Sequence, residues 1–229
     1  MITLRLEDNL SDLRNKLLEH GLVKIKCSKS ITIEEFELIT TSLGKPLVTD
    51  RHVLNTNRTV QELSNNALFG NEDVEWHHDW SYGRGNYFGT ILYNVKNAHL
   101  SPTWFCDMSK APAELKLLYK DEVGSYYPPI HLQDKCFTER QLRILEKQKV
   151  KRSFIINHHI TNEEILYCSI GSLQNNSVDV TPIKEWMERN AYRNEWEDND
   201  ILIWDNLKMN HKRVAFEGER LLWRTQFLI

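Results

Sequence analysis

The spacing of apolar residues near the start of the sequence predicts a helix, a strand and a second helix. Leucines recur at helical spacing over residues 11–20, and apolar and polar positions alternate over residues 22–27, as in a half-buried strand. The second helix, over residues 32–43, begins with a capping box in which the side chains of Thr32 and Glu35 each accept a backbone N–H.

Short segments rich in β-branched and aromatic residues dominate the rest of the chain. Strands are predicted at residues 87–95, 103–106, 153–158, 165–169, 200–205 and 220–229, and helices at residues 111–119, 138–149 and from 181 onward. Residues 49–71 predict a loop with one short strand. The order lacks the strand–helix alternation of a doubly wound sheet. It favours a mainly β fold with flanking helices, a double-stranded β-helix or jelly roll.

Composition narrows the class of protein. The 229 residues, 41% of them hydrophobic, suit a single domain over residues 1–229. The net charge is −3 and basic residues are scattered, so we expect no nucleic-acid partner. No segment approaches the roughly 18 apolar residues of a membrane span. The first residues lack an apolar signal run, and Cys27, Cys106, Cys136 and Cys168 form no CxxC pair, which predicts a cytoplasmic protein with reduced thiols.

The segment Trp76-His77-His78-Asp79-Trp80 concentrates potential metal ligands. In an extended chain successive side chains alternate, so His77 and Asp79 share a face and His78 points away. One imidazole and one carboxylate are two of the three ligands in the two-histidine, one-carboxylate set, which suits ferrous iron and leaves coordination positions open. A second, distant histidine is needed to complete such a site.

Residues after the apolar run at 201–204 supply candidates for the rest of the site. A polar turn leads to His211, whose imidazole can point back at the sheet. Arg220 and Arg224 are four residues apart, so in a strand they share one face. A guanidinium at the base of an apolar pocket suits a carboxylate, because it is planar, permanently charged and able to form two hydrogen bonds. The alternative is that both arginines are solvated.

Taken together, these residues form an ordered set. The order Trp76-His77-x-Asp79, Thr103, Trp204-Asp205-Asn206, His211 and Arg220-x-x-x-Arg224 resembles the taurine dioxygenase and clavaminate synthase family of iron(II)- and 2-oxoglutarate-dependent oxygenases. Segments at residues 21–25, 34–46 and 91–108 are similar as well. The resemblance covers most of the chain and is weakest over residues 120–152.

The resemblance implies a role for each residue of the set. His77, Asp79 and His211 would bind Fe(II), and Arg220, helped by the Thr103 hydroxyl, would bind the distal carboxylate of 2-oxoglutarate. Arg224 would support that carboxylate or reach an acidic group of the substrate. With O2 as the oxidant, the enzyme would hydroxylate, desaturate or cyclise a small molecule and release succinate and CO2. The presence of Asp79 disfavours the halogenase variant of this chemistry.

The chain departs from the family pattern in two places. Leu100-Ser101-Pro102-Thr103 stands where the family commonly has Gly-Gly-Asp-Thr, so the backbone around the Thr103 hydroxyl differs. Asn199-Asp200 stands where Gly-Asp often precedes the penultimate strand. The chain is also short for the family. We therefore expect a reduced lid, with a site that is open or completed by a partner such as a second copy in a homo-oligomer.

Two other functions fit parts of the pattern. A zinc hydrolase could use the same three ligands with one open position, but it gives the paired arginines no role. A non-catalytic jelly-roll binding module would need a fourth protein ligand to close a structural metal site. His78, His158 and His159 are candidates for that ligand by residue type.

The sequence gives weaker indications about the substrate. Four cations are expected near the mouth of the site and favour an anionic or amino-acid-like small molecule; they are Arg84, Lys212, Arg213 and Arg224. Aromatic residues flank the metal motif, namely Trp76, Trp80 and Tyr82, and they either line an apolar wall or belong to the core.

Overall fold

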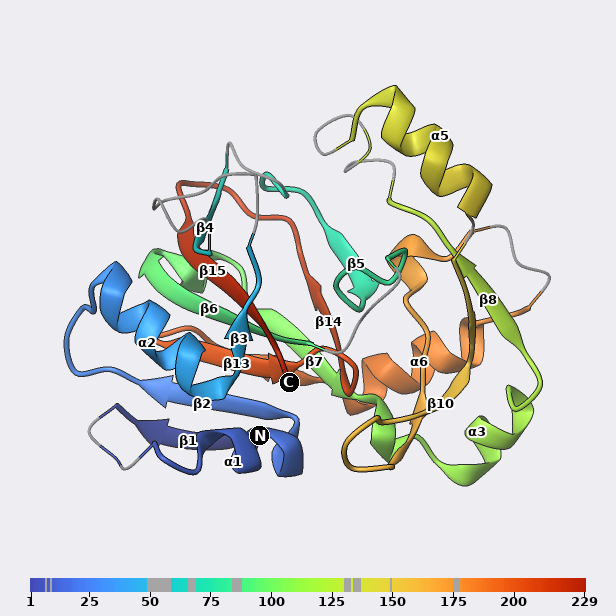
Figure 1. Cartoon of the computed structure of the whole chain (residues 1–229), viewed down its shortest axis with the longest axis horizontal. Helices are drawn as coiled ribbons and strands as arrows, with labels where there is room; N and C mark the ends of the chain where they lie inside the picture. The colour runs from blue at the N-terminus through green and yellow to red at the C-terminus, as the bar shows by residue number, and fades with distance from the viewer. Residues whose placement is uncertain are drawn as a thin grey trace.

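Two packed β-sheets and the helices around them form the body of the molecule (Figure 1). The structure is a computed structural model that describes residues 1–6, 8, 10–48, 59–65, 69–83, 88–129, 133, 137–148, 150–174 and 178–229. The arrangement is the mainly β jelly roll with flanking helices that the strand pattern predicts.

The larger sheet is built around a strand that is buried on both faces. Within the described residues it has seven strands, in the order β1 (Ile2–Arg5), β2 (Leu22–Lys26), β13 (Ile201–Asp205), β6 (Phe88–Lys96), β15 (Leu221–Leu228) and β3 (Lys45–Pro46), with β4 (Gln61–Ser64) also paired to β15. In β13, Ile201 and Ile203 pack toward the helices, whereas Leu202 and Trp204 pack toward the smaller sheet. A strand covered on both sides shows no polar alternation, which explains its continuous apolar sequence.

The smaller sheet packs its inner face on the larger one. Among the described residues it has four strands, in the order β12 (Tyr192–Asn194), β7 (Thr103–Asp107), β14 (Met209–Arg213) and β5 (Val74–His77). Phe105 and Met209 of this sheet join Leu92, Leu202 and Trp204 of the larger sheet in one buried cluster. The two sheets therefore share an apolar core.

Two helices, α1 (Leu13–His20) and α2 (Ile33–Leu43), cover the outer face of the larger sheet, on the left of Figure 1. The predicted capping box is confirmed: Glu35 N donates to Thr32 Oγ1 at 3.2 Å, and Thr32 N donates to Glu35 Oε2 at 2.8 Å. Gly21 ends α1 with φ of 69°, a left-handed conformation that glycine adopts without strain.

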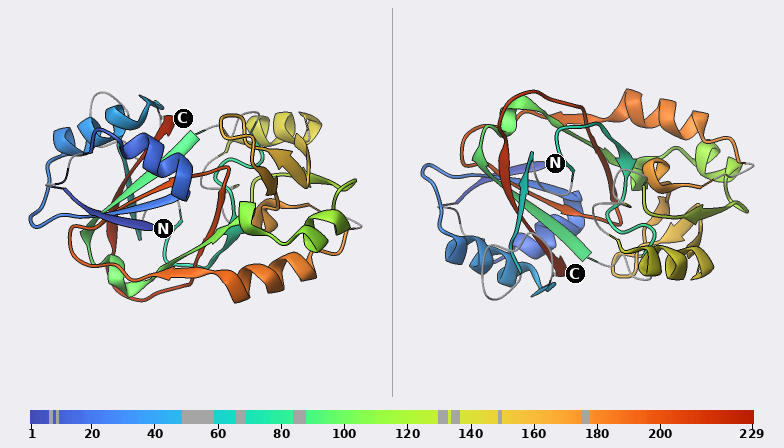
Figure 2. Two further views of the ribbon diagram at one scale, coloured as in Figure 1. Left: turned by 90° about the horizontal axis from the view of Figure 1, so that it is seen from below. Right: turned by 90° about the horizontal axis from the view of Figure 1, so that it is seen from above.

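The chain between β7 and β12 covers the outer face of the smaller sheet. It contains α3 (Ala113–Leu118), α5 (Glu139–Gln148) and α6 (Thr181–Asn190), and the strand pairs β8 (Val123–Tyr126) with β9 (Val150–Ser153) and β10 (Ile155–Asn157) with β11 (Glu164–Leu166). Figure 2 shows this segment at the end of the molecule opposite α1 and α2. Its core joins Trp76 and Cys106 of the smaller sheet to Ile183 and Met187 of α6.

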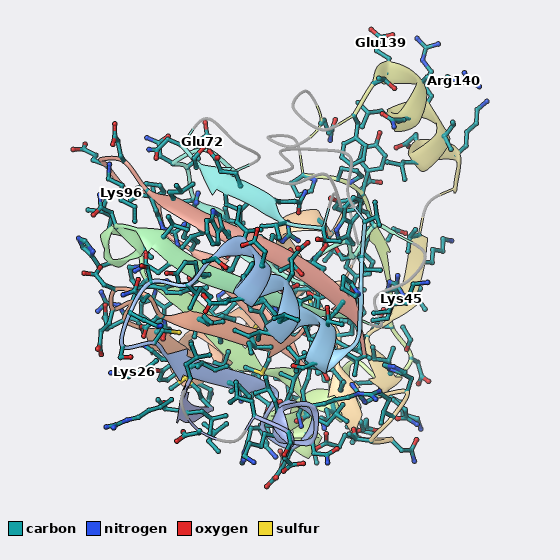
Figure 3. The ribbon with its side chains drawn as sticks, turned by 60° about the vertical axis from the view of Figure 1, so that its left-hand side comes forward. Lys26, Lys45, Glu72, Lys96, Glu139 and Arg140 are labelled. Atoms are coloured by element: carbon teal, nitrogen blue, oxygen red, sulfur yellow. The ribbon has the colours of Figure 1, made fainter. Side chains whose placement is uncertain are left out.

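Within the described residues the structure adds strands that the sequence did not predict, namely β1, β3, β5, β8, β9, β12 and β14. All are short, and β14 reads Met-Asn-His-Lys-Arg, which gives little β signal. Arg84, Cys136 and most of the segment 49–71 lie outside the described residues. None of the described helices has both the length and the apolar character that crossing a membrane requires. Charged side chains such as Lys45, Lys96, Glu72 and Glu139 point outward (Figure 3).

Candidate metal centre

The two candidate histidine ligands lie directly opposite each other on neighbouring strands. β5 and β14 pair antiparallel with His77 opposite His211, and their ring centroids are 4.1 Å apart. The sequence predicted that His211 returns to the site from a turn; instead it lies within a strand of the sheet that carries His77. Strand pairing thus places both imidazoles on the inner face without any special loop.

Asp79 completes a three-residue cluster. Its Oδ1 lies 3.7 Å from His77 Nε2 and 3.8 Å from His211 Nε2. All three ligand atoms lie within 4.8 Å of one another, and the cluster is mostly buried. Two ligand atoms that each lie about 2.1 Å from the same ion, with a right angle between the two bonds, are about 3.0 Å apart. The separations of 3.7 and 3.8 Å are wider than this, so the three ligand atoms would have to move closer together to bind an ion.

The protonation of the three ligands suits a metal. His77 Nδ1 lies 2.8 Å from the Glu75 carbonyl, to which it donates, and this leaves the lone pair on Nε2 free. Burial, and then the His77 imidazole, lower the pKa of His211 well below its ordinary value, so this ring is neutral. Burial raises the pKa of Asp79, but the Arg224 charge and the imidazoles outweigh it and hold that pKa well below its ordinary value.

The second carboxylate oxygen of Asp79 faces donors rather than the histidines. Oδ2 is 3.0 Å from Arg224 Nη2, and it accepts hydrogen bonds from Thr90 Oγ1 at 3.0 Å and from Gln226 Nε2 at 3.2 Å. The Asp79 backbone is fixed by Asn206, whose side chain accepts from Asp79 N at 2.7 Å and donates to Asp79 O at 3.0 Å. Oδ1 is therefore the oxygen presented to a metal.

His78 points away from the metal centre, as predicted, but into a second buried region. Its Nδ1 is 2.7 Å from the Asn206 carbonyl, and its ring stacks on Tyr167 with centroids 4.4 Å apart. Its backbone N–H donates to Ser169 Oγ at 3.1 Å. Burial lowers the pKa of His78 to about 4, so it packs as a neutral ring.

The structure separates the two arginines that the sequence placed together. Arg224 pairs with Asp79, whereas the Arg220 guanidinium lies over the Phe216 ring, 5.5 Å from its centroid. Arg220 is 5% exposed, and no described residue accepts a hydrogen bond from its Nε. Burial, and then repulsion by Arg213, lower its pKa to about 9. Among the described residues this cation has no counter-charge, which an anionic ligand would bring.

Arg213 is a neighbour of Arg220 that the sequence did not single out for this role. Its guanidinium lies 5.0 Å from the same Phe216 ring centroid and donates to the carbonyls of Phe69 and Glu72. The available signal was alternation: Arg213 is two residues beyond His211 and so shares its face of the strand. This signal can be used only if residues 209–213 are known to form a strand, and their polar sequence does not predict one.

Thr103 lies on the same face, opposite Arg213 across the β7–β14 pair. Its Oγ1 accepts a hydrogen bond from Trp196 Nε1 at 3.1 Å. Because an indole N–H only donates, the hydroxyl keeps its own hydrogen for a carboxylate. The altered backbone of residues 100–103 therefore leaves the hydroxyl buried and usable. That Thr103 and Arg220 share one carboxylate stays a prediction.

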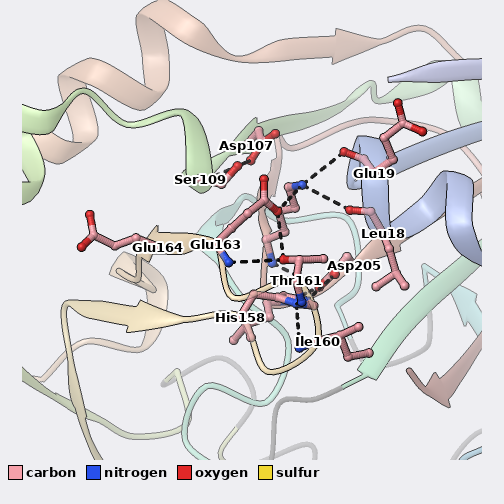
Figure 4. Close-up of polar contacts among 12 residues, drawn as sticks. Leu18, Glu19, Asp107, Ser109, His158, Ile160, Thr161, Glu163, Glu164 and Asp205 are labelled. Carbon is pink, nitrogen blue, oxygen red and sulfur yellow. Dashed lines mark hydrogen bonds and ion pairs between the residues drawn. The ribbon is translucent and has the colours of Figure 1, made fainter.

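The remaining candidate histidines lie elsewhere. His158 Nε2 is 2.8 Å from Asp205 Oδ2, and its Nδ1 accepts the N–H groups of Ile160 and Thr161 (Figure 4). This polar network stabilises the turn that follows β13, since Asp205 Oδ1 also accepts from the backbone of Lys208 at 3.2 Å. His159 lies beside His158 and outside the metal cluster. None of the proposed fourth ligands is part of the described cluster.

Two histidines and one carboxylate on the inner face of a jelly roll define a mononuclear metal enzyme of the non-haem iron type. The chain matches the family model described as "Taurine catabolism dioxygenase TauD, TfdA family" over residues 3–226. It belongs to this family and is an Fe(II)- and 2-oxoglutarate-dependent dioxygenase. Family membership sets aside the zinc hydrolase and the non-catalytic binding module.

Solved structures share the fold. A taurine dioxygenase from Burkholderia xenovorans has a TM-score of 0.70 and 18% identity, covering 96% of this chain and 79% of that chain. AAD-2 in complex with Mn(II) and N-oxalylglycine has a TM-score of 0.69 and 15% identity, covering 94% of this chain and 86% of that chain. PvcB, an Fe, alpha-ketoglutarate dependent oxygenase from an isonitrile synthetic pathway, has a TM-score of 0.68 and 16% identity, covering 98% of this chain and 82% of that chain. No curated protein sequence matches the chain. At these identities the likeness shows the fold alone.

Proposed function

We propose that the protein oxidises a small molecule at an iron held by His77, Asp79 and His211, with Arg220 binding the distal carboxylate of 2-oxoglutarate. The observation that carries the proposal is the convergence of two imidazole Nε2 atoms on one carboxylate oxygen, at 3.7 and 3.8 Å. Iron and 2-oxoglutarate, when bound, supply the activation of dioxygen and yield succinate and CO2. The chain supplies the ligands, the anchoring charge and burial from water.

Arg220 supports the second half of the proposal. A buried guanidinium that has no counter-charge among the described residues is costly, so its presence fits an anion that arrives with the co-substrate. The Thr103 hydroxyl is the proposed helper, because its oxygen already accepts from Trp196 and its hydrogen can be donated. Hydroxylation is the proposed outcome; desaturation or ring closure needs only a different substrate pose.

The charge of the substrate is less defined than the sequence indicated. Of the four cations expected at the mouth, Lys212 lies over the Trp76 and Trp104 rings, and its Nζ donates to both carboxylate oxygens of Glu188 at 2.6 Å. Arg213 binds two loop carbonyls, and Arg224 pairs with Asp79. Arg84 lies outside the described residues. We therefore propose a small-molecule substrate without assigning its charge; a succinate-release screen over anionic, neutral and cationic metabolites would identify it.

The test of the proposal needs no substrate. Fe(II) and 2-oxoglutarate added without oxygen should give a weak visible charge-transfer band in the wild type. His77→Ala, Asp79→Ala and His211→Ala should abolish the band, and His78→Ala should retain it as the matched control. A band that survives loss of any ligand residue would remove that residue from the site. The homo-oligomer, the cytoplasmic location and the single domain over residues 1–229 stay predictions from the sequence.

A further inference from the structure

Gln226 lies on the strand that carries Arg224, two residues further along. In β15, Leu222 packs between the two sheets, whereas Trp223 and Phe227 pack against the helices. By alternation Arg224 and Gln226 share the inner face, and Thr225 faces α2, where its hydroxyl lies 3.3 Å from Thr40 Oγ1. Gln226 is 8% exposed, so its amide must find partners inside the protein.

The two ends of the Gln226 amide have different partners. Nε2 donates to Asp79 Oδ2 at 3.2 Å and to Thr90 Oγ1 at 3.3 Å, and Oε1 accepts from Trp80 Nε1 at 3.3 Å. The orientation of the amide follows from its neighbours, because an ionised carboxylate only accepts and an indole N–H only donates. Gln226 therefore joins the carboxylate of Asp79 to the indole of Trp80, the residue that follows Asp79 in the sequence.

Trp80 is in an unusual position for a large aromatic residue. It directly follows Asp79, has φ of 55° and is 46% exposed. A non-glycine residue in the left-handed region is held there by its surroundings, and such residues cluster at active sites. The turn bond from Gly83 N to Trp80 O, 2.7 Å long, contributes to this restraint, and Tyr82 lies beside the indole with ring centroids 5.8 Å apart.

We propose that Gln226 is a positioning residue that holds Asp79 for coordination through Oδ1 alone and links this carboxylate to Trp80 at the surface of the site. The inference rests on the proposed role of Asp79 as a metal ligand. Three donors on Oδ2 turn that oxygen away from the imidazoles, and Gln226 is the donor whose other end accepts from the indole N–H of Trp80, the residue after Asp79. Loss of the amide frees the carboxylate to rotate or to bind through both oxygens.

The test compares metal binding in variants at Gln226 and Trp80. Gln226→Leu keeps the volume, and Asp79 Oδ2 retains Arg224 and Thr90, so the fold should survive. Outer partners of ligands typically contribute 10- to 100-fold in metal affinity, so Gln226→Leu should weaken Co(II) binding by about that factor and change the visible spectrum of the Co(II) protein. Trp80→Phe removes the indole N–H together with part of the ring, leaves the Gln226 donor to Asp79 in place, and should weaken Co(II) binding less.

Thr225→Val is the matched control, because it removes a buried hydroxyl from the same strand on the opposite face. It should leave both Co(II) affinity and the spectrum at wild-type values. Gln226→Leu with wild-type affinity and spectrum would overturn the proposal, and so would equal losses in Gln226→Leu and Thr225→Val, which would indicate general weakening of β15. Wild-type Co(II) affinity and spectrum in Trp80→Phe would overturn the proposed link to Trp80. Failure of the wild type to bind Co(II) through His77, Asp79 and His211 would instead contradict the proposed function.

Discussion

Two buried charges in the jelly roll have opposite surroundings. Asp79 gives one oxygen to three donors of the protein and points the other toward two imidazoles. Arg220 lies against Phe216, is repelled by Arg213 and has a buried Nε that donates to no described residue. The protein itself therefore supplies the partners of Asp79, whereas Arg220 has no counter-charge among the described residues, and the proposed function assigns that counter-charge to 2-oxoglutarate. Variants at the two ends should therefore change stability in opposite directions.

The largest effect should come from Asp79→Ala. This change removes a metal ligand and leaves the Arg224 guanidinium buried without its partner, which costs about 3–5 kcal/mol of unfolding free energy. Urea unfolding of the metal-free protein measures it. Adding Arg224→Met should recover most of the stability without restoring metal binding. If Asp79→Ala is as stable as the wild type, the ion pair does not contribute as described.

Arg220→Met should have the opposite sign in the ligand-free protein. It replaces an uncompensated buried cation, so the unfolding free energy should stay level or rise. The loss of a charge-assisted bidentate contact, about 2–3 kcal/mol, should weaken 2-oxoglutarate binding roughly 30- to 150-fold. Calorimetric titration measures the binding, and Arg220→Lys should recover part of it, because an ammonium cannot form the fork. Destabilisation of the ligand-free protein would mean that Arg220 already has a counter-charge.

Arg224→Ala tests which end of the site this residue serves, because the family resemblance assigned it to the co-substrate or the substrate and the structure pairs it with Asp79. We expect metal affinity to fall about 10- to 100-fold, since an outer partner of a ligand is lost. The affinity for 2-oxoglutarate, measured at saturating metal, should change less than in Arg220→Met. If metal affinity is unchanged and succinate forms in excess of oxidised product, Arg224 contacts the substrate rather than positioning Asp79.

The smallest effect should come from His78→Ala, on the far side of the metal motif. The lost stack on Tyr167 and the lost hydrogen bond to Asn206 should lower the unfolding free energy by about 1–2 kcal/mol. Metal affinity should stay within a few-fold of the wild type, because His78 offers no atom to the cluster. A large loss of metal affinity would show that packing behind the motif also sets the ligand geometry.

Local patterns predicted what depends on local chemistry. The capping box at Thr32 and the buried run at residues 201–204 were readable, because each signal lies within a few residues. The sharing of a face by His77 and Asp79 followed from alternation, and the structure brings both to His211.

Contacts between distant segments were not readable from the sequence. That His211 lies opposite His77 depends on the pairing of β5 with β14, and the polar sequence of β14 gives no strand signal. The same limit applies to Arg224, whose partner Asp79 comes from another part of the fold. Alternation along the strand predicts that Gln226 shares the face of Arg224. Its partners Asp79, Thr90 and Trp80 could not be predicted, because they come from distant parts of the sequence.

The opposition of His77 and His211 also bears on the order of events during folding. The loop between them spans most of the chain, and closing a loop of that size is entropically unfavourable until strands such as β6 and β15 have paired. A metal ion therefore cannot nucleate this protein in the way that zinc nucleates a zinc finger. The polypeptide has to fold first, and the ion then binds to ligands that are already assembled, so a chelator should strip the metal and leave a cooperatively folded chain.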